Sequence, residues 1–459
     1  MIDSSGKRVS DGSESEAEKL LRSIRFIKKV DDPDSIATKK SLAEKYHHLA
    51  CICFEGKEYE KALRYEQQAF PLYEELYRKG AKESALNLAF AYVILRETYP
   101  QIQDDTGKTN ELQAAEKAVA YFREAVESDD SDFNRKNYVI AICEHAKRVA
   151  ENNFDKAKEL YHAAIDAAED WPETGSQKTK VFHIALSYEK LFIFLKGKTE
   201  QEPSRMTEVK EEMETAVLRL YDFYRKYAEL LPDSTTAQEY YALACDKARH
   251  FYLNSDHEDG DEKAKRFNEE ENRLYFLLAR HDPFLYFENF LLTSKWLLQY
   301  LNPRDPDRIY TDLCERMQRG CRKVTRYLDR RTAEGADNPP SASSEISLWV
   351  HWAEVMSLLA SARYQQNDDR QEFIGYKIEV IKALEPRILW LRNHKEKETE
   401  LMEAFFEAFR AIYDLDRSLI TDDLQSCLRI VVKPVFSSLL WSQKRLCSHI
   451  LTNGGNKSV

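Results

Sequence analysis

The sequence is short of the residues that make turns. It contains 13 glycines and 13 prolines among 459 residues, whereas these types usually make up about 7% and about 5% of a protein. All-β and doubly wound α/β chains need many more turns, so the shortage excludes both classes and favours long helices. Aromatic residues make up 12% of the chain and hydrophobic residues 43%, which is enough for a continuous core and argues against global disorder.

Cysteine is also scarce. The chain has eight cysteines, and no two of them form a C-x-x-C pair. Zinc ribbons and disulfide scaffolds need closely spaced or abundant cysteines, so both are excluded. We expect reduced thiols in an intracellular protein.

Long apolar runs and a hydrophobic leader are missing as well. No stretch approaches the roughly 18 apolar residues that a transmembrane helix requires, and the first residues are rich in Ser, Asp and Glu. The formal net charge of −11 at pH 7 favours solubility and disfavours non-specific nucleic-acid binding by the whole chain. We expect a soluble cytoplasmic protein without a transmembrane segment.

Residues 18–282 carry a repeated pattern of paired helices, which follows a predicted disordered, acidic and Ser-rich tail at residues 1–17. First helices share an apolar–alanine pair with a larger side chain three residues later: Leu49-Ala50…Cys53, Leu88-Ala89…Tyr92 and Ile184-Ala185…Tyr188. Second helices share an alanine followed by apolar or small residues four and seven positions on: Ala118, Phe122, Ala125; Ala157, Tyr161, Ala164; and Ala216, Leu220, Phe223. Small residues let antiparallel helices approach closely, and large ones fill the seam.

The first of these pairs resembles a tetratricopeptide repeat. Tyr46-His47-His48-Leu49-Ala50…Cys53 is followed by Glu58-Tyr59-Glu60-Lys61-Ala62…Gln68-Ala69, with Tyr for Trp, Ala for Gly and Glu66 where an aromatic residue is usual. The resemblance covers about residues 35–280 as four or five degenerate copies, with insertion loops at Gln101 to Asn110 and Lys196 to Pro203. It implies an all-α, TPR-like solenoid of antiparallel helix pairs that binds partners on its concave surface.

The pattern changes after residue 282. Residues 283–333 predict a helical hairpin, residues 334–344 a linker, and residues 345–459 an atypical C-terminal helical region with a capping helix. From Leu424 onward the chain contains basic residues but no acidic ones. This amphipathic end can close the repeat array, dock a partner, or lie on a membrane surface.

The repeat register places a set of side chains in the predicted partner-binding groove: His47, Cys51, Phe54, Leu86, Phe90 and Val93. Two other interpretations stay open for His47 and Cys51, namely plain packing and a metal-binding face that lacks two further ligands. Repeat proteins that clamp C-terminal carboxylates use Lys and Asn at equivalent sites. In this sequence other residues largely replace the Lys and Asn at those groove sites, so no carboxylate clamp is expected.

A helix expected from about Asp307 to Arg331 has an apolar stripe on one side and a basic ridge on the other. The stripe consists of Leu313, Met317, Cys321, Val324 and Leu328, at helical spacing. The basic ridge consists of Arg316, Arg319, Arg322, Lys323, Arg326 and Arg330. Such a ridge suits phosphates or an acidic protein surface, and the net charge favours acidic protein. The alternative is a solvated helix face.

Catalytic motifs are incomplete or missing. Gly107-Lys108-Thr109 and Gly197-Lys198-Thr199 lack the first glycine of a phosphate-binding loop, and neither H-E-x-x-H nor G-x-S-x-G occurs. We therefore expect no enzyme, no cofactor and no metal. The sequence predicts a non-enzymatic protein–protein interaction scaffold or regulatory subunit that binds a partner protein or peptide. The alternative is a regulator that contacts nucleic acid or a nucleoprotein through the ridge at 316–330.

Overall fold

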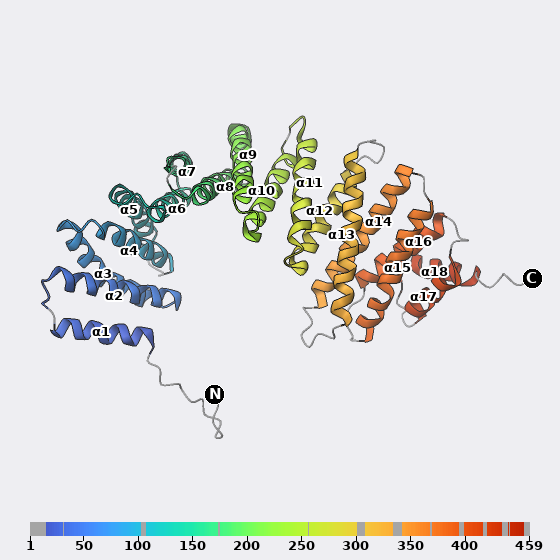
Figure 1. Ribbon diagram of the computed structural model, residues 1–459, viewed down its shortest axis with the longest axis horizontal. Helices are drawn as coiled ribbons and strands as arrows, with labels where there is room; N and C mark the ends of the chain where they lie inside the picture. The colour runs from blue at the N-terminus through green and yellow to red at the C-terminus, as the bar shows by residue number, and fades with distance from the viewer. Residues whose placement is uncertain are drawn as a thin grey trace, which may run out of the picture. The chain divides into compact units, whose positions relative to one another are not determined.

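The computed structural model describes most of the chain. The described residues are 15–30, 32–101, 107–172, 175–255, 257–300, 308–333, 342–367, 370–393, 399–415, 420–433, 439 and 441–453. All regular secondary structure within them is helical (Figure 1), as the sequence predicts. None of the described helices combines the length and the hydrophobicity that a membrane span needs.

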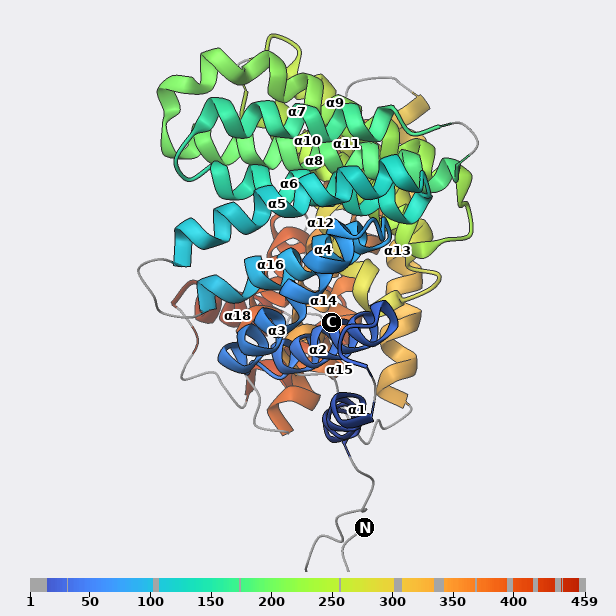
Figure 2. The same cartoon turned by 90° about the vertical axis from the view of Figure 1, so that its left-hand side faces the viewer.

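The chain divides into two compact units, of which unit 1 is Met1–Leu231. Its helices are α1 (Glu16–Val30), α2 (Ile36–Glu55), α3 (Tyr59–Arg78), α4 (Ser84–Thr98), α5 (Gly107–Ser128), α6 (Asp132–Val149), α7 (Phe154–Glu169), α8 (Gln177–Gln201) and α9 (Met206–Leu230), with short 3₁₀ turns at Tyr99–Gln101 and Pro203–Arg205. Pairs form between α2 and α3, α4 and α5, α6 and α7, and α8 and α9 (Figure 2). The second helix of a pair packs on the first helix of the next. Unit 1 is thus a TPR-like, antiparallel helix-pair solenoid.

Alanine allows the paired helices to approach closely. Ala62 and Ala69 on α3, and Ala157 and Ala164 on α7, are fully buried. A buried methyl group keeps two helix backbones near the short end of the usual 8–10 Å separation. Phe122 on α5, which is 2% exposed, fills the neighbouring seam. The alanine markers of the sequence are therefore core positions, whereas the large markers Tyr92, Tyr188 and Phe223 are half-buried.

One predicted insertion loop is wrong, and the other lies partly outside the described residues. Lys196 to Gln201 continue α8, and only Pro203–Arg205 forms a short 3₁₀ turn before α9. Helices α8 and α9 are each 25 residues long, so longer helices take up the extra sequence. At the first predicted loop, Gln101 ends a 3₁₀ turn and α5 already begins at Gly107. Residues 102–106 lie outside the described residues.

Unit 2 is Pro232–Val459. Its helices are α10 (Thr235–Leu253), α11 (Gly260–Leu278), α12 (Pro283–Tyr300), α13 (Arg308–Ala333), α14 (Ala342–Asn367), α15 (Arg370–Asn393), α16 (Thr399–Leu415), α17 (Asp422–Val432) and α18 (Trp441–Asn453). Helix α11 packs between α10 and α12, α12 contacts both α13 and α14, and α14 to α16 form a further packed group. The α10–α11–α12 arrangement positions the candidate site.

Two segments differ at their edges from the predicted tail and linker. Helix α1 begins at Glu16 because Ser15 and Glu18 form a reciprocal cap: the Glu18 N–H donates to the Ser15 hydroxyl, and the Ser15 N–H donates to the Glu18 carboxylate. Residues 342–344 of the predicted linker belong to α14. Residues 1–14 of the tail and 334–341 of the linker lie outside the described residues. The predicted domain boundaries and the capping role of the C-terminus stay predictions.

Candidate functional site

The predicted groove residues of unit 1 lie on α2 and α4. All are partly buried: His47, Cys51, Phe54, Leu86, Phe90 and Val93. Those on α4 pack against the core shared by α4, α5 and α6, and the Phe90 ring lies 5.2 Å from that of Phe122, centroid to centroid. The Phe54 ring lies 5.7 Å from that of Tyr59. These aromatic side chains are thus engaged with their own chain, and partner binding by this set stays a prediction.

His47 belongs to a buried ion pair. Its Nδ1 lies 3.0 Å from a carboxylate oxygen of Glu66, which is fully buried on α3, and its Nε2 lies 3.8 Å from Cys51 Sγ. Burial opposes a charge on His47, but hydrogen bonding to Cys51 and Glu66 outweighs it and raises the pKa of the imidazole to about 10. Among the described residues, no three His, Cys, Asp or Glu side chains are grouped to hold a metal ion. His47 and Glu66 therefore form a closed pair within unit 1.

The basic ridge lies on α13. Met317, Cys321 and Val324 of the apolar stripe are buried, whereas the side chains of Leu313 and Leu328 lie outside the described residues. On the other side the ridge residues are exposed except for one: Arg319, Arg322, Lys323, Arg326 and Arg330 are exposed, and Arg316 is half-buried.

Helix α11 contributes to the surroundings of this ridge. The Lys323 ammonium lies 4.4 Å from the centroid of the Phe276 ring on α11. Desolvation lowers the pKa of Lys323, and the charges of Arg280 and Arg319 lower it further. Arg316 differs from the other ridge residues, because burial partly desolvates its guanidinium group and it lies near Glu269. Positive charge is thus concentrated where the end of α11 meets α13.

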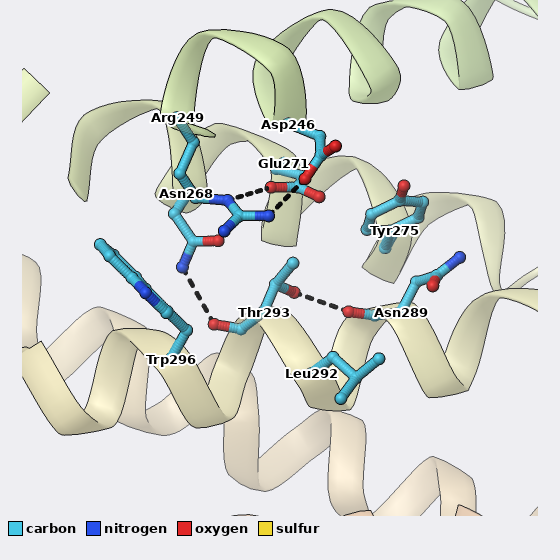
Figure 3. Close-up of a pocket in the computed structure, with 9 residues that line it drawn as sticks. All are labelled: Asp246, Arg249, Asn268, Glu271, Tyr275, Asn289, Leu292, Thr293 and Trp296. Atoms are coloured by element: carbon cyan, nitrogen blue, oxygen red, sulfur yellow. Dashed lines mark hydrogen bonds and ion pairs between the residues drawn. The ribbon is translucent and has the colours of Figure 1, made fainter. Parts of the chain in front are cut away.

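Sequence reasoning missed a pocket between α10, α11 and α12, here called the α10–α12 pocket. Its volume is about 310 Å³, which falls within the usual size of ligand sites. The nine lining residues, drawn in Figure 3, are Asp246, Arg249, Asn268, Glu271, Tyr275, Asn289, Leu292, Thr293 and Trp296. All three helices belong to unit 2, so the pocket is built within one compact unit.

A buried charge cluster forms one wall of the pocket. The Arg249 Nε donates to Glu271 over 3.1 Å, and its terminal nitrogen donates to Asp246. The Arg249 guanidinium also lies 5.9 Å from the centroid of the Trp296 ring. The side chains of Arg249 and Glu271 are only 12% and 4% exposed. Burial at this depth fixes the geometry of the pair.

Glu271 is poised to exchange a proton near neutral pH. Burial raises the pKa of its carboxyl group to about 8; the Arg249 guanidinium lowers it, and Asp246 raises it. At pH 7 the carboxyl group is therefore mostly protonated. A positive charge brought into the pocket favours the carboxylate and displaces that proton.

Asn268 places an unsatisfied acceptor beside this wall. The side chain is fully buried, and its Nδ2 donates to the Thr293 carbonyl oxygen over 3.0 Å, which fixes the orientation of the amide. Its Oδ1 has no hydrogen-bond partner within the described parts of the chain. Figure 3 shows this oxygen directed into the space between Arg249 and Thr293. A buried carbonyl without a donor costs about 1–3 kcal/mol, so a ligand that donates there would recover this free energy.

Exposed leucines flank the pocket. Leu292 is 42% exposed at its rim, and Leu285, two turns earlier on α12, is 53% exposed. Positions 285, 289, 292 and 296 share one face of α12 by their helical spacing. Leu243 on α10, one turn before Asp246, is 44% exposed. Apolar and polar groups therefore form one surface along the two helices.

The repeat register contained a signal for this site. Ala62, Glu66 and Ala69 on α3 have the same spacing as Ala264, Asn268 and Glu271 on α11. Ala264 is fully buried, as an alanine marker should be. In the intervening copies the second position holds Phe122, Tyr161 or Leu220. Polar residues at two core positions of α11 therefore mark the site, and extending the register to α11 would have found it.

No protein-family model matches the chain, and no curated protein is similar to it in sequence. Among solved structures, a circular tandem repeat protein with novel repeat topology is 13% identical, with 92% of this chain and 100% of that one covered and a TM-score of 0.33. A human IFIT1 dimer with m7Gppp-AAAA is 12% identical, with 97% and 96% covered and a TM-score of 0.25. Naa15/Naa10 bound to HypK-THB is 12% identical, with 96% and 95% covered and a TM-score of 0.13. Similarities of this size carry no argument about what this chain binds.

Proposed function

We propose that the protein is a non-enzymatic protein–protein interaction scaffold or regulatory subunit, and that it binds a segment of a partner protein along α10 and α12. The observation that carries the proposal is the α10–α12 pocket, where a buried charge cluster and an unsatisfied amide oxygen lie beside exposed leucines. Apolar contacts with a few fixed polar groups are typical of recognition sites. Because the surface is carried by packed helices, binding orders little of the scaffold.

The groups in the pocket favour binding over catalysis. The guanidinium of Arg249 donates to the carboxyl groups of Glu271 and Asp246, and the Thr293 hydroxyl donates to backbone carbonyls of its own helix. Neither group is arranged as a nucleophile beside a general base, which is the arrangement that covalent catalysis needs. The chemistry supports orientation of a bound group.

A charge placed at the rim tests the proposal. The tagged chain is recovered from its native extract after nuclease treatment, and co-purifying proteins are quantified by mass spectrometry. Leu292→Arg should remove a stoichiometric partner, because it places a cation on the apolar rim. Ile193→Arg is the matched control, since Ile193 is 48% exposed on α8 in unit 1. Equal recovery of every partner by both variants, with unchanged helix content, would contradict the proposal.

The basic ridge supports a second candidate function, contact with nucleic acid or a nucleoprotein. Five of its six side chains are exposed, and Arg280 adds charge nearby. Phosphate contacts release counterions, so affinity would fall steeply with salt. The double variant Arg319→Glu and Arg326→Glu should reduce the slope of log affinity against log salt by about 2. An unchanged slope would remove the ridge from consideration.

A further inference from the structure

We propose that the α10–α12 pocket receives a basic side chain, lysine or arginine, from the bound partner segment. This inference rests on the proposed function and names the chemistry that the partner must carry. The pocket presents acceptors for such a group: the carboxyl oxygens of Asp246 and Glu271 and the unsatisfied Oδ1 of Asn268. An ammonium or guanidinium group offers only donors, so it matches this set.

An anion fits the same pocket poorly. Arg249 is the cation of the cluster, and its Nε and a terminal nitrogen already donate to Glu271 and Asp246. An anion would also have to lie beside the carboxyl oxygens of Asp246 and Glu271 and the unsatisfied oxygen of Asn268, all of which are acceptors. A negative charge in the pocket would also keep Glu271 protonated and neutral. Glu271 would then offer the anion no compensating charge.

A partner side chain fits better than a free small cation because of the surface around the pocket. Leu285 and Leu292 on α12 and Leu243 on α10 remain exposed beside it. The aliphatic part of a lysine or arginine, and its apolar neighbours in the partner sequence, would cover these leucines. A free cation would leave them in water. The occupant is thus a peptide segment with a basic residue between apolar ones.

Proton release accompanies binding. When a cation enters the pocket, Glu271 releases its proton to solvent and becomes a carboxylate. Its negative charge then balances the positive charge of the bound group. The titratable and charged groups that face Glu271 are Cys245, Asp246 and Arg249 on α10 and Tyr275 on its own helix. Helix α12 contributes Asn289, Thr293 and Trp296 to the lining, none of which titrates between pH 7 and pH 9. Binding of a cation should therefore strengthen as the pH rises through about 8.

Four capped amino acids provide defined probes: N-acetyl methylamides of lysine, arginine, glutamine and glutamate. Binding to the full chain is measured by NMR from the indole N–H signal of Trp296, which the variant Trp296→Phe assigns. The lysine and arginine probes should saturate this signal, and the other two should bind at least about tenfold more weakly. The affinity of the basic probes should rise about tenfold from pH 7 to pH 9, because the fraction of ionised Glu271 rises by about that factor, while the probes stay charged.

Two neighbouring glutamates on α11 separate a role in the pocket from a general charge effect. Glu271→Gln should abolish the pH dependence and weaken binding of the basic probes. Glu270→Gln should leave the pH dependence and the affinity for the basic probes unchanged, because Glu270 is ion-paired with Arg273 and does not line the pocket. Tighter binding of the glutamate probe, absence of saturable binding by the basic probes, or a pH-independent affinity would overturn the inference.

The outcomes distinguish this inference from the proposed function. If Leu292→Arg loses the partner protein while the basic probes fail to bind the wild-type chain, the partner site stands and its assigned chemistry is wrong. If the basic probes bind as expected but Leu292→Arg keeps every partner, the pocket chemistry stands and the proposed function is wrong.

Discussion

Glu66 in unit 1 and Glu271 in unit 2 are buried carboxyl groups on the second helix of a pair, yet their surroundings differ. Glu66 is fully buried and faces His47, which closes the pair. Glu271 faces Arg249 from α10 and lines an open pocket. The carboxyl group of Glu66 is thus fully engaged with a side chain of its own unit. The carboxyl group of Glu271 also lines a pocket that a ligand could enter.

The difference shows what a polar residue at a core position of a repeat does. Where a cation from the preceding helix satisfies it, as at His47, the polar residue acts as a structural contact. Where the cation is shared, as Arg249 is shared between Asp246 and Glu271, the polar residue lines a pocket. Together with the oxygen of Asn268, this arrangement is the basis of the proposed binding surface along α10 and α12.

The largest expected effect separates the two carboxyl groups directly. Glu66→Gln should lower the free energy of unfolding by about 3 kcal/mol at pH 7, because it leaves a buried charged partner uncompensated. Glu271→Gln should not lower it, because the wild-type carboxyl group must take up a proton to fold at this pH and glutamine avoids that cost. Urea denaturation followed by circular dichroism measures both. Equal losses would mean that Glu271 is as closed a contact as Glu66.

The pH dependence of stability should sharpen the contrast. The pKa of Glu271 is raised from 4.5 to about 8 in the folded chain. Its contribution to the free energy of unfolding is therefore fully present below pH 4.5 and is lost as the pH rises through 8. Glu271→Gln should therefore gain about 4 kcal/mol relative to wild type between pH 5 and pH 9. Urea midpoints at the two pH values measure this gain. A constant difference would show that Glu271 does not titrate in this range.

The same measurement tests the His47 pair over a different range. The pKa of His47 is raised from 6.5 to about 10, so the pair stabilises fully below pH 6.5, and this contribution is lost as the pH rises through 10. Wild type should lose about 2.5 kcal/mol of stability from this pair between pH 7 and pH 9, and His47→Gln should not show that loss. Parallel curves for the two chains would contradict the assignment.

The smallest effect concerns two asparagines on α11. Asn268→Leu should change stability by less than about 1 kcal/mol, because the loss of one hydrogen bond to the Thr293 carbonyl oxygen is offset by removal of an acceptor that lacks a donor. Asn272→Leu should cost about 2 kcal/mol, since the Nδ2 of Asn272 donates to the hydroxyl groups of Thr293 and Ser294. Thermal unfolding compares them. A larger loss from Asn268→Leu would indicate a structural rather than a ligand-binding amide.

Much of the fold follows from local patterns. The alanine markers such as Ala62 and Ala157 identify helix contacts because only a small side chain fits where two helices cross. The apolar stripe of Met317, Cys321 and Val324 indicates the buried face of α13 by its spacing alone. The loop expected at Lys196 to Pro203 fails because surplus sequence between two markers can extend helices as well as insert a loop, and spacing does not distinguish the two.

The candidate site was harder to predict because it depends on contacts between three helices. Arg249, Glu271 and Trp296 are far apart in the sequence, and the shared ion pair exists only once α10, α11 and α12 are packed. The groove residues Phe54 and Phe90 satisfied the repeat register, but the register does not show that the rings of Tyr59 and Phe122 pack edge-to-face against them. Polar residues at core positions were the available signal.

Site-specific photocrosslinking tests the central claim most directly. A benzophenone amino acid is placed at Leu292 on the rim of the α10–α12 pocket and, as a control, at Ile193 in unit 1, and crosslinked proteins are identified after nuclease treatment. The account predicts one stoichiometric partner crosslinked from position 292 and not from position 193, through a segment with a basic residue between apolar ones. A partner crosslinked from neither position, although it co-purifies with the chain, would contradict it.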